Sequence, residues 1–102
     1  MLNYRVVVSV SAELDIHVAG IWYKTRSKQV ASKFLDKIDL AFKRIFTNPF
    51  AFSRISAKSK YRRYRTPGFP YRIYYYINEP FVEIMAVVHT RRSDKFVNRR
   101  LK

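Results

Sequence analysis

Cysteine is absent from this chain of 102 residues, which excludes disulfide bonds and thiolate metal sites. A stable fold without cross-links fits a reducing compartment, so we expect a cytoplasmic protein. Long apolar runs are missing as well. The early run Val6–Val8 is far shorter than a signal-peptide core or a membrane span, and no later segment comes closer. The sequence therefore predicts a protein that is neither secreted nor embedded in a membrane.

Glycine and histidine are scarce, which disfavours nucleotide-binding loops and histidine-based metal sites. Gly20 and Gly68 are the two glycines of the chain, so no glycine-rich phosphate loop can form and nucleotide hydrolysis is disfavoured. Neither His17 nor His89 has a second histidine and a carboxylate at metal-ligand spacing. We therefore expect no metal site and no cofactor.

Acidic residues are few: seven stand against 21 lysines and arginines, giving a formal net charge of +14. Eight phenylalanines and eight tyrosines exceed what a disordered basic tail contains, so this charge must lie on a folded body. The length predicts one domain over residues 1–102. Its partner should be anionic, either nucleic acid or an acidic protein. A membrane surface is set aside because both predicted helices commit their apolar stripes to the core.

The first part of the chain predicts a strand followed by a helix. Tyr4–Val10 is rich in valine and alternates loosely, which favours a strand. Ser11 is the expected N-cap of a helix that starts near Ala12, and Thr25–Lys28 should end it as a polar turn. Four large apolar residues at helical spacing predict its buried stripe: Leu14, Val18, Ile21 and Trp22.

A second helix and three strands should follow. The helix has one apolar face, made by Val30, Phe34, Ile38, Ala41, Phe42 and Ile45, and ends at Asn48-Pro49. The runs Tyr61–Arg65, Tyr71–Asn78 and Phe81–Thr90 should pair as an antiparallel meander. The basic tail 91–102 is either a helical turn or a frayed end. We predict an α+β fold in which two N-terminal helices pack on a twisted, mainly antiparallel four-stranded sheet, in the order β-α-α-β-β-β.

The positive charge is concentrated in the second half. From Leu40 to Asn78 there is no acidic residue, and nine basic ones occur: Lys43, Arg44, Arg54, Lys58, Lys60, Arg62, Arg63, Arg65 and Arg72. Side chains alternate between faces along a strand, and regular pairing puts Ile84, Ala86 and Val88 in the core. One sheet face should then carry five functional candidates: Arg63, Arg65, Arg72, His89 and Arg91.

Several segments, in this order and spacing, resemble the RelE/ParE toxin superfamily, whose members are also called plasmid stabilisation proteins. They are V-x-V-S-x-S-A-E-L-D-I (6–16), I-W-Y (21–23), A-S-K-F-L-D-K-I (31–38), F-P-Y-R-I-Y-Y (69–75) and V-V-H-T-R-R (87–92). The resemblance covers nearly the whole chain. It implies a growth-arresting toxin that is neutralised by an acidic cognate antitoxin encoded beside it, and a fold with two helices on a twisted antiparallel sheet.

The superfamily divides by target. RelE-like members cut messenger RNA on the ribosome, whereas ParE-like members poison DNA gyrase and need no active site. By this resemblance Arg63 and Arg65 occupy the positions of a RelE-like lysine pair, and Arg72 and Arg91 match two further arginines. These cations would stabilise charge on a scissile phosphate.

A proton-transfer group is harder to find. Arginine stays protonated, and the tail tyrosine of RelE-like enzymes would fall near Phe96 or Val97. The remaining candidates are His89, Tyr61, Tyr64 and Tyr74. In ParE-like members the V-x-H pattern indicates a structural histidine. We therefore favour gyrase binding without catalysis, and keep a metal-independent endoribonuclease that cuts messenger RNA as the alternative.

Further residues are candidates for binding the target or the antitoxin: Lys60, Arg62, Tyr74, Tyr76, Arg92, Lys95, Arg99 and Arg100. The two tyrosines could stack on bases or simply pack across strands. The basic tail could contact phosphate or acidic protein, and the C-terminal region of ParE-like toxins is associated with poisoning. A second alternative is a non-toxic nucleic-acid-binding domain, whose affinity would fall steeply with salt.

Overall fold

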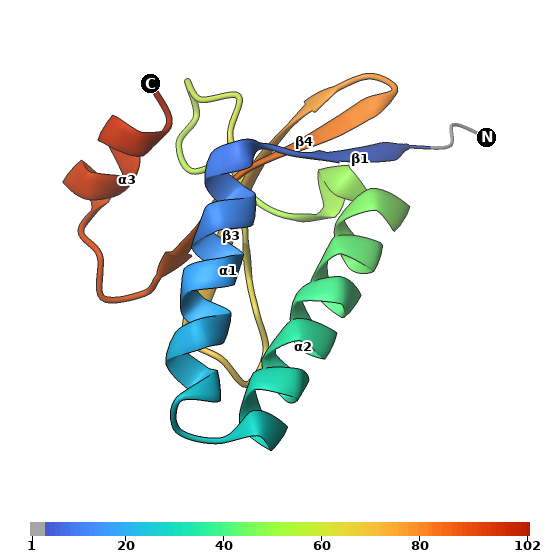
Figure 1. Ribbon diagram of the computed structural model, residues 1–102. Helices are drawn as coiled ribbons and strands as arrows, with labels where there is room; N and C mark the ends of the chain where they lie inside the picture. The colour runs from blue at the N-terminus through green and yellow to red at the C-terminus, as the bar shows by residue number, and fades with distance from the viewer. Residues whose placement is uncertain (1–3) are drawn as a thin grey trace.

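The computed structural model describes residues 4–102, and its elements follow the predicted order (Figure 1). They are β1 (Arg5–Val8), α1 (Val10–Lys24), α2 (Lys28–Thr47), a short 3-10 helix η1 (Pro49–Ala51), β2 (Arg62–Arg65), β3 (Tyr71–Asn78), β4 (Phe81–His89) and α3 (Asp94–Arg100). The strands form one sheet in the order β1-β4-β3-β2. β1 is parallel to β4, and the other pairs are antiparallel. The predicted α+β fold is confirmed.

Two layers cover the sheet. α1 and α2 lie side by side on one face, where Phe34, Ile38 and Ile45 join Ile73 and Ile84 in the larger apolar cluster (Figure 1). α3 packs on the opposite face, where a smaller cluster forms. The sheet is therefore buried on both faces along β3 and β4. Within residues 4–102 no helix combines the length and apolarity needed to cross a membrane.

The second helix behaves as its pattern predicts. Phe34, Ile38, Ala41 and Ile45 are buried, and the helix ends at Thr47, before Asn48-Pro49. Val30 is the exception in the predicted stripe, since it lies at the exposed first turn.

The first helix differs from the prediction in two respects. It begins at Val10, because the hydroxyl of Ser9 accepts a hydrogen bond from the Ala12 N–H at 3.0 Å, so Ser9 rather than Ser11 is the N-cap. The face that packs on the sheet is made by small residues, Ala12 and Ala19, which let the helix backbone approach β4 closely.

The predicted core stripe of α1 is therefore wrong. Leu14, Val18, Ile21 and Trp22 are between 48% and 59% exposed, so they do not form part of the core. Both faces of this helix carry apolar side chains, and periodicity alone does not say which face is buried. The buried face of α1 is instead made by Ala12 and Ala19, with Ile16 and Tyr23 packed beside them.

A β-bulge in β4 overturns a second expectation. Tyr74 pairs with Ala86 and Tyr75 with Ile84, so Met85 has no partner on β3. An extra residue in one strand reverses the alternation beyond it. Ile84 accordingly packs with α1 and α2, whereas Ala86 and Val88 pack against α3 on the other face.

The tail is a folded helix and not a frayed end. Ser93 caps α3 by accepting a hydrogen bond from the Phe96 N–H at 3.1 Å. Val97 and Leu101 are buried against Tyr74, Ala86 and Val88. The hydroxyl of Tyr61 donates to the Leu101 carbonyl at 2.7 Å, which anchors the end of the chain.

Candidate functional site

Three of the predicted arginines lie together on the α3 face of the sheet. In the β2–β3 register Arg65 is opposite Arg72, and Arg63 is opposite Tyr74. Residues directly opposite one another in antiparallel strands project to the same face. These arginines line one open cavity of about 420 Å³, whose other lining residues are Ala51, Phe52, Ser53 and Tyr64. The arginine cavity thus contains three guanidinium groups and, among the lining residues, no carboxylate or imidazole.

His89 does not share that cavity, contrary to the prediction. Because the bulge at Met85 reverses the alternation, His89 pairs with Tyr71 on the α1–α2 side of the sheet. Arg91 follows it in a turn, and the two line a separate cavity beside Trp22. The five-residue constellation expected from regular pairing is therefore split between two sides of the sheet.

The imidazole of His89 is held in a structural arrangement. Its Nδ1 accepts a hydrogen bond from the Arg91 N–H at 3.0 Å, and its ring meets Tyr71 edge to face at 5.2 Å. Burial, together with the charges of Arg91 and Arg92, lowers the pKa of His89 below its ordinary value of 6.5. The ring is therefore neutral at physiological pH, with its acceptor nitrogen occupied.

The three tyrosines considered as proton carriers are occupied or covered. Tyr61 donates to the carbonyl of Leu101, and the hydroxyl of Tyr64 accepts a hydrogen bond from the Arg44 guanidinium at 3.1 Å. Tyr74 is 2% exposed because α3 covers it, so the expected surface position of Tyr74 is wrong. Base stacking by Tyr74 would require α3 to leave the sheet.

Some of the remaining binding candidates are held by contacts within the protein, and others have exposed positions. Arg62 donates to the Phe52 carbonyl at 2.6 Å, which ties β2 to the preceding loop. Tyr76 is partly buried under the ammonium group of Lys60, which lies 4.2 Å from its ring centroid. Three basic residues have exposed positions at the C-terminal end: Arg92, Lys95 and Arg99.

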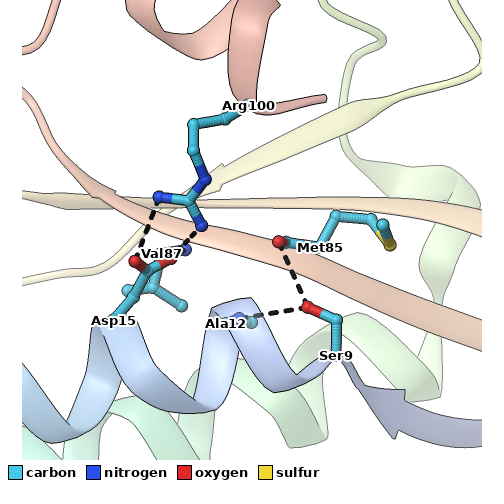
Figure 2. A network of polar contacts seen from close by, with 6 residues as sticks. All are labelled: Ser9, Ala12, Asp15, Met85, Val87 and Arg100. Atoms are coloured by element: carbon cyan, nitrogen blue, oxygen red, sulfur yellow. Dashed lines mark hydrogen bonds and ion pairs between the residues drawn. The ribbon is translucent and has the colours of Figure 1, made fainter. Parts of the chain in front are cut away.

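The side chain of Arg100 is held within the protein, in a polar network that the sequence did not predict (Figure 2). Its two terminal nitrogens contact the carboxylate oxygens of Asp15 at 3.1 and 2.8 Å, and Asp15 also accepts the Val87 N–H at 2.9 Å. At the N-cap of α1, the hydroxyl of Ser9 donates to the Met85 carbonyl at 3.3 Å. β1 pairs with β4 only as far as Ile84. Beyond that point, the side chains of Ser9 and Asp15 supply hydrogen bonds to the backbone groups of β4. The sequence places Asp15, like Glu13, in the first part of the helix, but nothing in local spacing identifies its partners.

A groove lies between α1 and the C-terminal segment 91–100, and sequence reasoning missed it. Two adjoining cavities of about 500 and 240 Å³ share Tyr71, His89 and Arg92 as lining residues. The walls of this α1–α3 groove are Val18 and Trp22 on α1, and Arg91, Arg92, Phe96 and Arg100 on the other side. Its signal was present as an apolar stripe on α1, but helical spacing alone assigns that stripe to the core.

Comparison with known proteins gives a family and a fold. Residues 3–94 match the model of a family described as "ParE toxin of type II toxin-antitoxin system, parDE". A solved structure described as "Chromosomal ParDE TA system from P. aeruginosa" superposes with a TM-score of 0.76 at 13% sequence identity, covering 87% of this chain and 98% of the other. No curated protein sequence matches the chain. At that identity the structural match establishes the fold, and the family model establishes the relationship.

Proposed function

Because this chain belongs to the ParE toxin family of type II toxin–antitoxin systems, we propose that it arrests growth by binding DNA gyrase without a catalytic step. The observation that carries this proposal is the composition of the arginine cavity. Arg63, Arg65 and Arg72 supply cations, and no lining residue is a histidine, aspartate or glutamate. A surface of this kind binds an anionic partner, and its one phenol, Tyr64, already accepts a hydrogen bond from Arg44, which disfavours a role as a general base.

The binding surface would continue from the arginine cavity onto α3. A second open cavity, of about 330 Å³, joins Arg63 to the N-terminal half of α3 through Asp94, Val97 and Asn98. Lys95 and Arg99 are exposed on the same helix. Cations spread over β2, β3 and α3 would steer the protein toward acidic regions of gyrase or toward its bound DNA.

The proposed partner in the resting cell is an acidic cognate antitoxin. Toxins of this family belong to toxin–antitoxin systems, and the similar solved structure is itself described as such a system. A net charge of +14 favours an acidic inhibitor, which would neutralise the toxin while both remain in the cytoplasm. Growth arrest on induction, reversed by co-expressing the adjacent reading frame, is the expected behaviour.

Gyrase assays test the proposed mechanism. We expect the purified chain to inhibit DNA supercoiling and to leave messenger RNA on programmed ribosomes intact. Arg63→Ala, Arg65→Ala and Arg72→Ala should each weaken inhibition, and Lys37→Ala on the exposed side of α2 is the matched control. An unchanged supercoiling rate at full expression and correct folding would refute the gyrase proposal.

An endoribonuclease of the RelE type remains the second candidate, because three guanidinium groups in one cavity could also stabilise charge on a phosphate. Cleavage of ribosome-bound messenger RNA that disappears in Arg72→Ala would favour it over gyrase binding. A non-toxic nucleic-acid-binding domain would instead bind free RNA or DNA, with an affinity that falls steeply between low and moderate salt.

A further inference from the structure

We propose that two copies of this chain associate through α1, with their α1 helices packed side by side in opposite directions about a two-fold axis. Such a dimer would form from the free chain, whatever the target of the toxin is. Three features of α1 support it: an exposed apolar side, the lack of cations along most of the helix, and charges of opposite sign near its two ends.

The first feature is an apolar side of α1 that the rest of the described chain leaves uncovered (Figure 1). Val10, Leu14, Val18 and Ile21 follow one another at intervals of three or four residues, so they share one side of the helix. Val10 is 82% exposed, and the other three are close to half exposed or more. At about 3.6 residues per turn, this row lies opposite the two buried alanines of the helix. A row of exposed apolar side chains on one helix is typical of a protein-binding surface.

The second feature is the charge of this part of the surface. Between Arg5 and Lys24 the chain has no lysine or arginine, although it has 21 of them in all. The three arginines of the arginine cavity lie on the other face of the sheet from α1, so the sheet separates them from a partner docked on this helix. A second copy therefore meets less electrostatic repulsion at α1 than at the arginine cavity. Nucleic acid would find no cation along the apolar row to pair with its phosphates.

The third feature selects the direction of packing. Glu13 near the start of α1 and Lys24 at its end are exposed, and helical spacing places them with His17 along one flank of the apolar row. Neither Glu13 nor Lys24 forms an ion pair within residues 4–102. Rotation about a two-fold axis near Val18 brings Glu13 of each copy beside the partner's Lys24. A parallel pair would instead align the two helix dipoles and place like ends together, so the antiparallel pair is favoured.

The antiparallel pair also matches the apolar row to itself. Leu14 of each copy would meet the partner's Ile21, and Val18 would lie against its own counterpart next to the axis, as an isologous contact requires. Because α1 and the arginine cavity lie on opposite faces of the sheet, both cavities of the dimer would open away from the interface. The dimer would thus present two anion-binding surfaces, and a target with two sites would bind it with increased avidity.

Sedimentation of the purified chain over a range of concentrations tests the association. One helix per copy makes a small interface, so we expect a dissociation constant on the order of micromolar. Val18→Glu brings two carboxylates together at the axis and should raise the dissociation constant about tenfold or more. Leu40→Glu is the matched control, because it places the same charge at an exposed apolar position of α2, and it should not raise the dissociation constant. Circular dichroism establishes that each variant is folded.

Charge reversal tests the antiparallel direction. Glu13→Lys and Lys24→Glu should each raise the dissociation constant about threefold to tenfold, because each change makes two symmetric contacts repulsive. Lys24→Glu lowers the net charge of both copies, so its effect cannot come from overall repulsion. The double variant Glu13→Lys/Lys24→Glu restores the attraction and should return the constant toward the wild-type value. Asp36→Lys, at an exposed position on α2, is the control for Glu13→Lys.

The absence of cysteine from the chain permits a covalent test. Val18→Cys places one thiol beside the axis in each copy, so oxidised glutathione should convert the two thiols into an intermolecular disulfide. Leu40→Cys has an exposed thiol on α2 and should remain largely monomeric under the same conditions.

Three results would overturn the inference. They are a wild-type chain that sediments as a monomer well above micromolar concentration, equal effects of Val18→Glu and Leu40→Glu, and a double charge variant that associates no better than the single ones. A fourth is a thiol in the Val18→Cys variant that maleimide labels freely in the chain alone and that is protected only by the protein from the adjacent reading frame. None of these results bears on the inhibition of gyrase, which is measured separately.

Discussion

Arg65 on β2 and Arg72 on β3 are directly opposite one another in the strand register, so two guanidinium groups project side by side from one face of the sheet. Like charges at opposite positions destabilise a sheet. A fold selected for stability alone would place a carboxylate or a neutral side chain at one of these positions. The pair therefore supports the proposal that this face binds an anionic partner.

Replacing Arg65 by glutamine should stabilise the fold while weakening the toxin. We expect a gain of about 0.2–1 kcal/mol in the free energy of unfolding at low ionic strength, because the opposed charge is removed. The gain should shrink as salt is added, since screening weakens the repulsion in the wild type. Urea denaturation at two salt concentrations measures both effects. Lys37→Gln, which removes an exposed charge without a directly opposed partner, should give a smaller gain.

The carboxylate of Asp15 should contribute more than a surface ion pair usually does. Asp15→Ala removes the partner of Arg100 and leaves the Val87 N–H without its acceptor. We expect a loss of about 1–3 kcal/mol in the free energy of unfolding, as found for partly buried groups that lose a hydrogen bond. Arg100→Ala should cost less, since the contact between Asp15 and Val87 survives. Asp36→Ala, an exposed carboxylate on α2, is the control, and an equal loss there would contradict the role of Asp15.

Phe34 and Trp22 should differ sharply in their contribution to stability. Phe34 is 0% exposed, so Phe34→Ala opens a cavity that costs about 3–5 kcal/mol. Trp22 is larger but lies on the surface, and Trp22→Ala should cost about 1 kcal/mol or less. Thermal and urea denaturation followed by circular dichroism gives both values. A larger loss for Trp22→Ala would place that side chain in the core after all.

The stability of the fold should decline at high pH through Tyr75. Burial raises the pKa of Tyr75 from 10.0 to about 12, and its hydroxyl donates to the Pro49 carbonyl at 2.6 Å. The folded state therefore disfavours ionisation of Tyr75. The un-ionised hydroxyl contributes to the free energy of unfolding, and this stabilisation is complete below pH 10.0 and is lost as the pH rises through about 12.

Tyr75→Phe tests this pH dependence. Because the variant has no hydroxyl to ionise, the difference between wild type and variant should narrow above pH 10.0. At neutral pH the variant should be less stable by about 1–3 kcal/mol, since the Pro49 carbonyl loses its buried donor. Urea midpoints measured from neutral pH up to about pH 12 make the comparison. Parallel profiles would show that Tyr75 does not ionise differently in the folded and unfolded states.

Local patterns determined most of the architecture. The apolar face of α2, the stop at Asn48-Pro49 and the three C-terminal strands follow from helical and strand periodicity, since each signal lies within one element. The common face of Arg63, Arg65 and Arg72 also follows from alternation, because β2 and the first half of β3 pair regularly. The sequence alone therefore determined the α+β order and the shared face of these three arginines.

Tertiary packing decided which face of α1 is buried and which side of the sheet His89 occupies. Ala12 and Ala19 pack closely on β4, which leaves Trp22 on the surface as a wall of the groove. One unpaired residue, Met85, reverses the alternation in β4 and separates His89 from the arginines. Neither outcome is encoded in local spacing. A helix with two apolar faces and a strand with one extra residue take their orientation from the elements against which they pack.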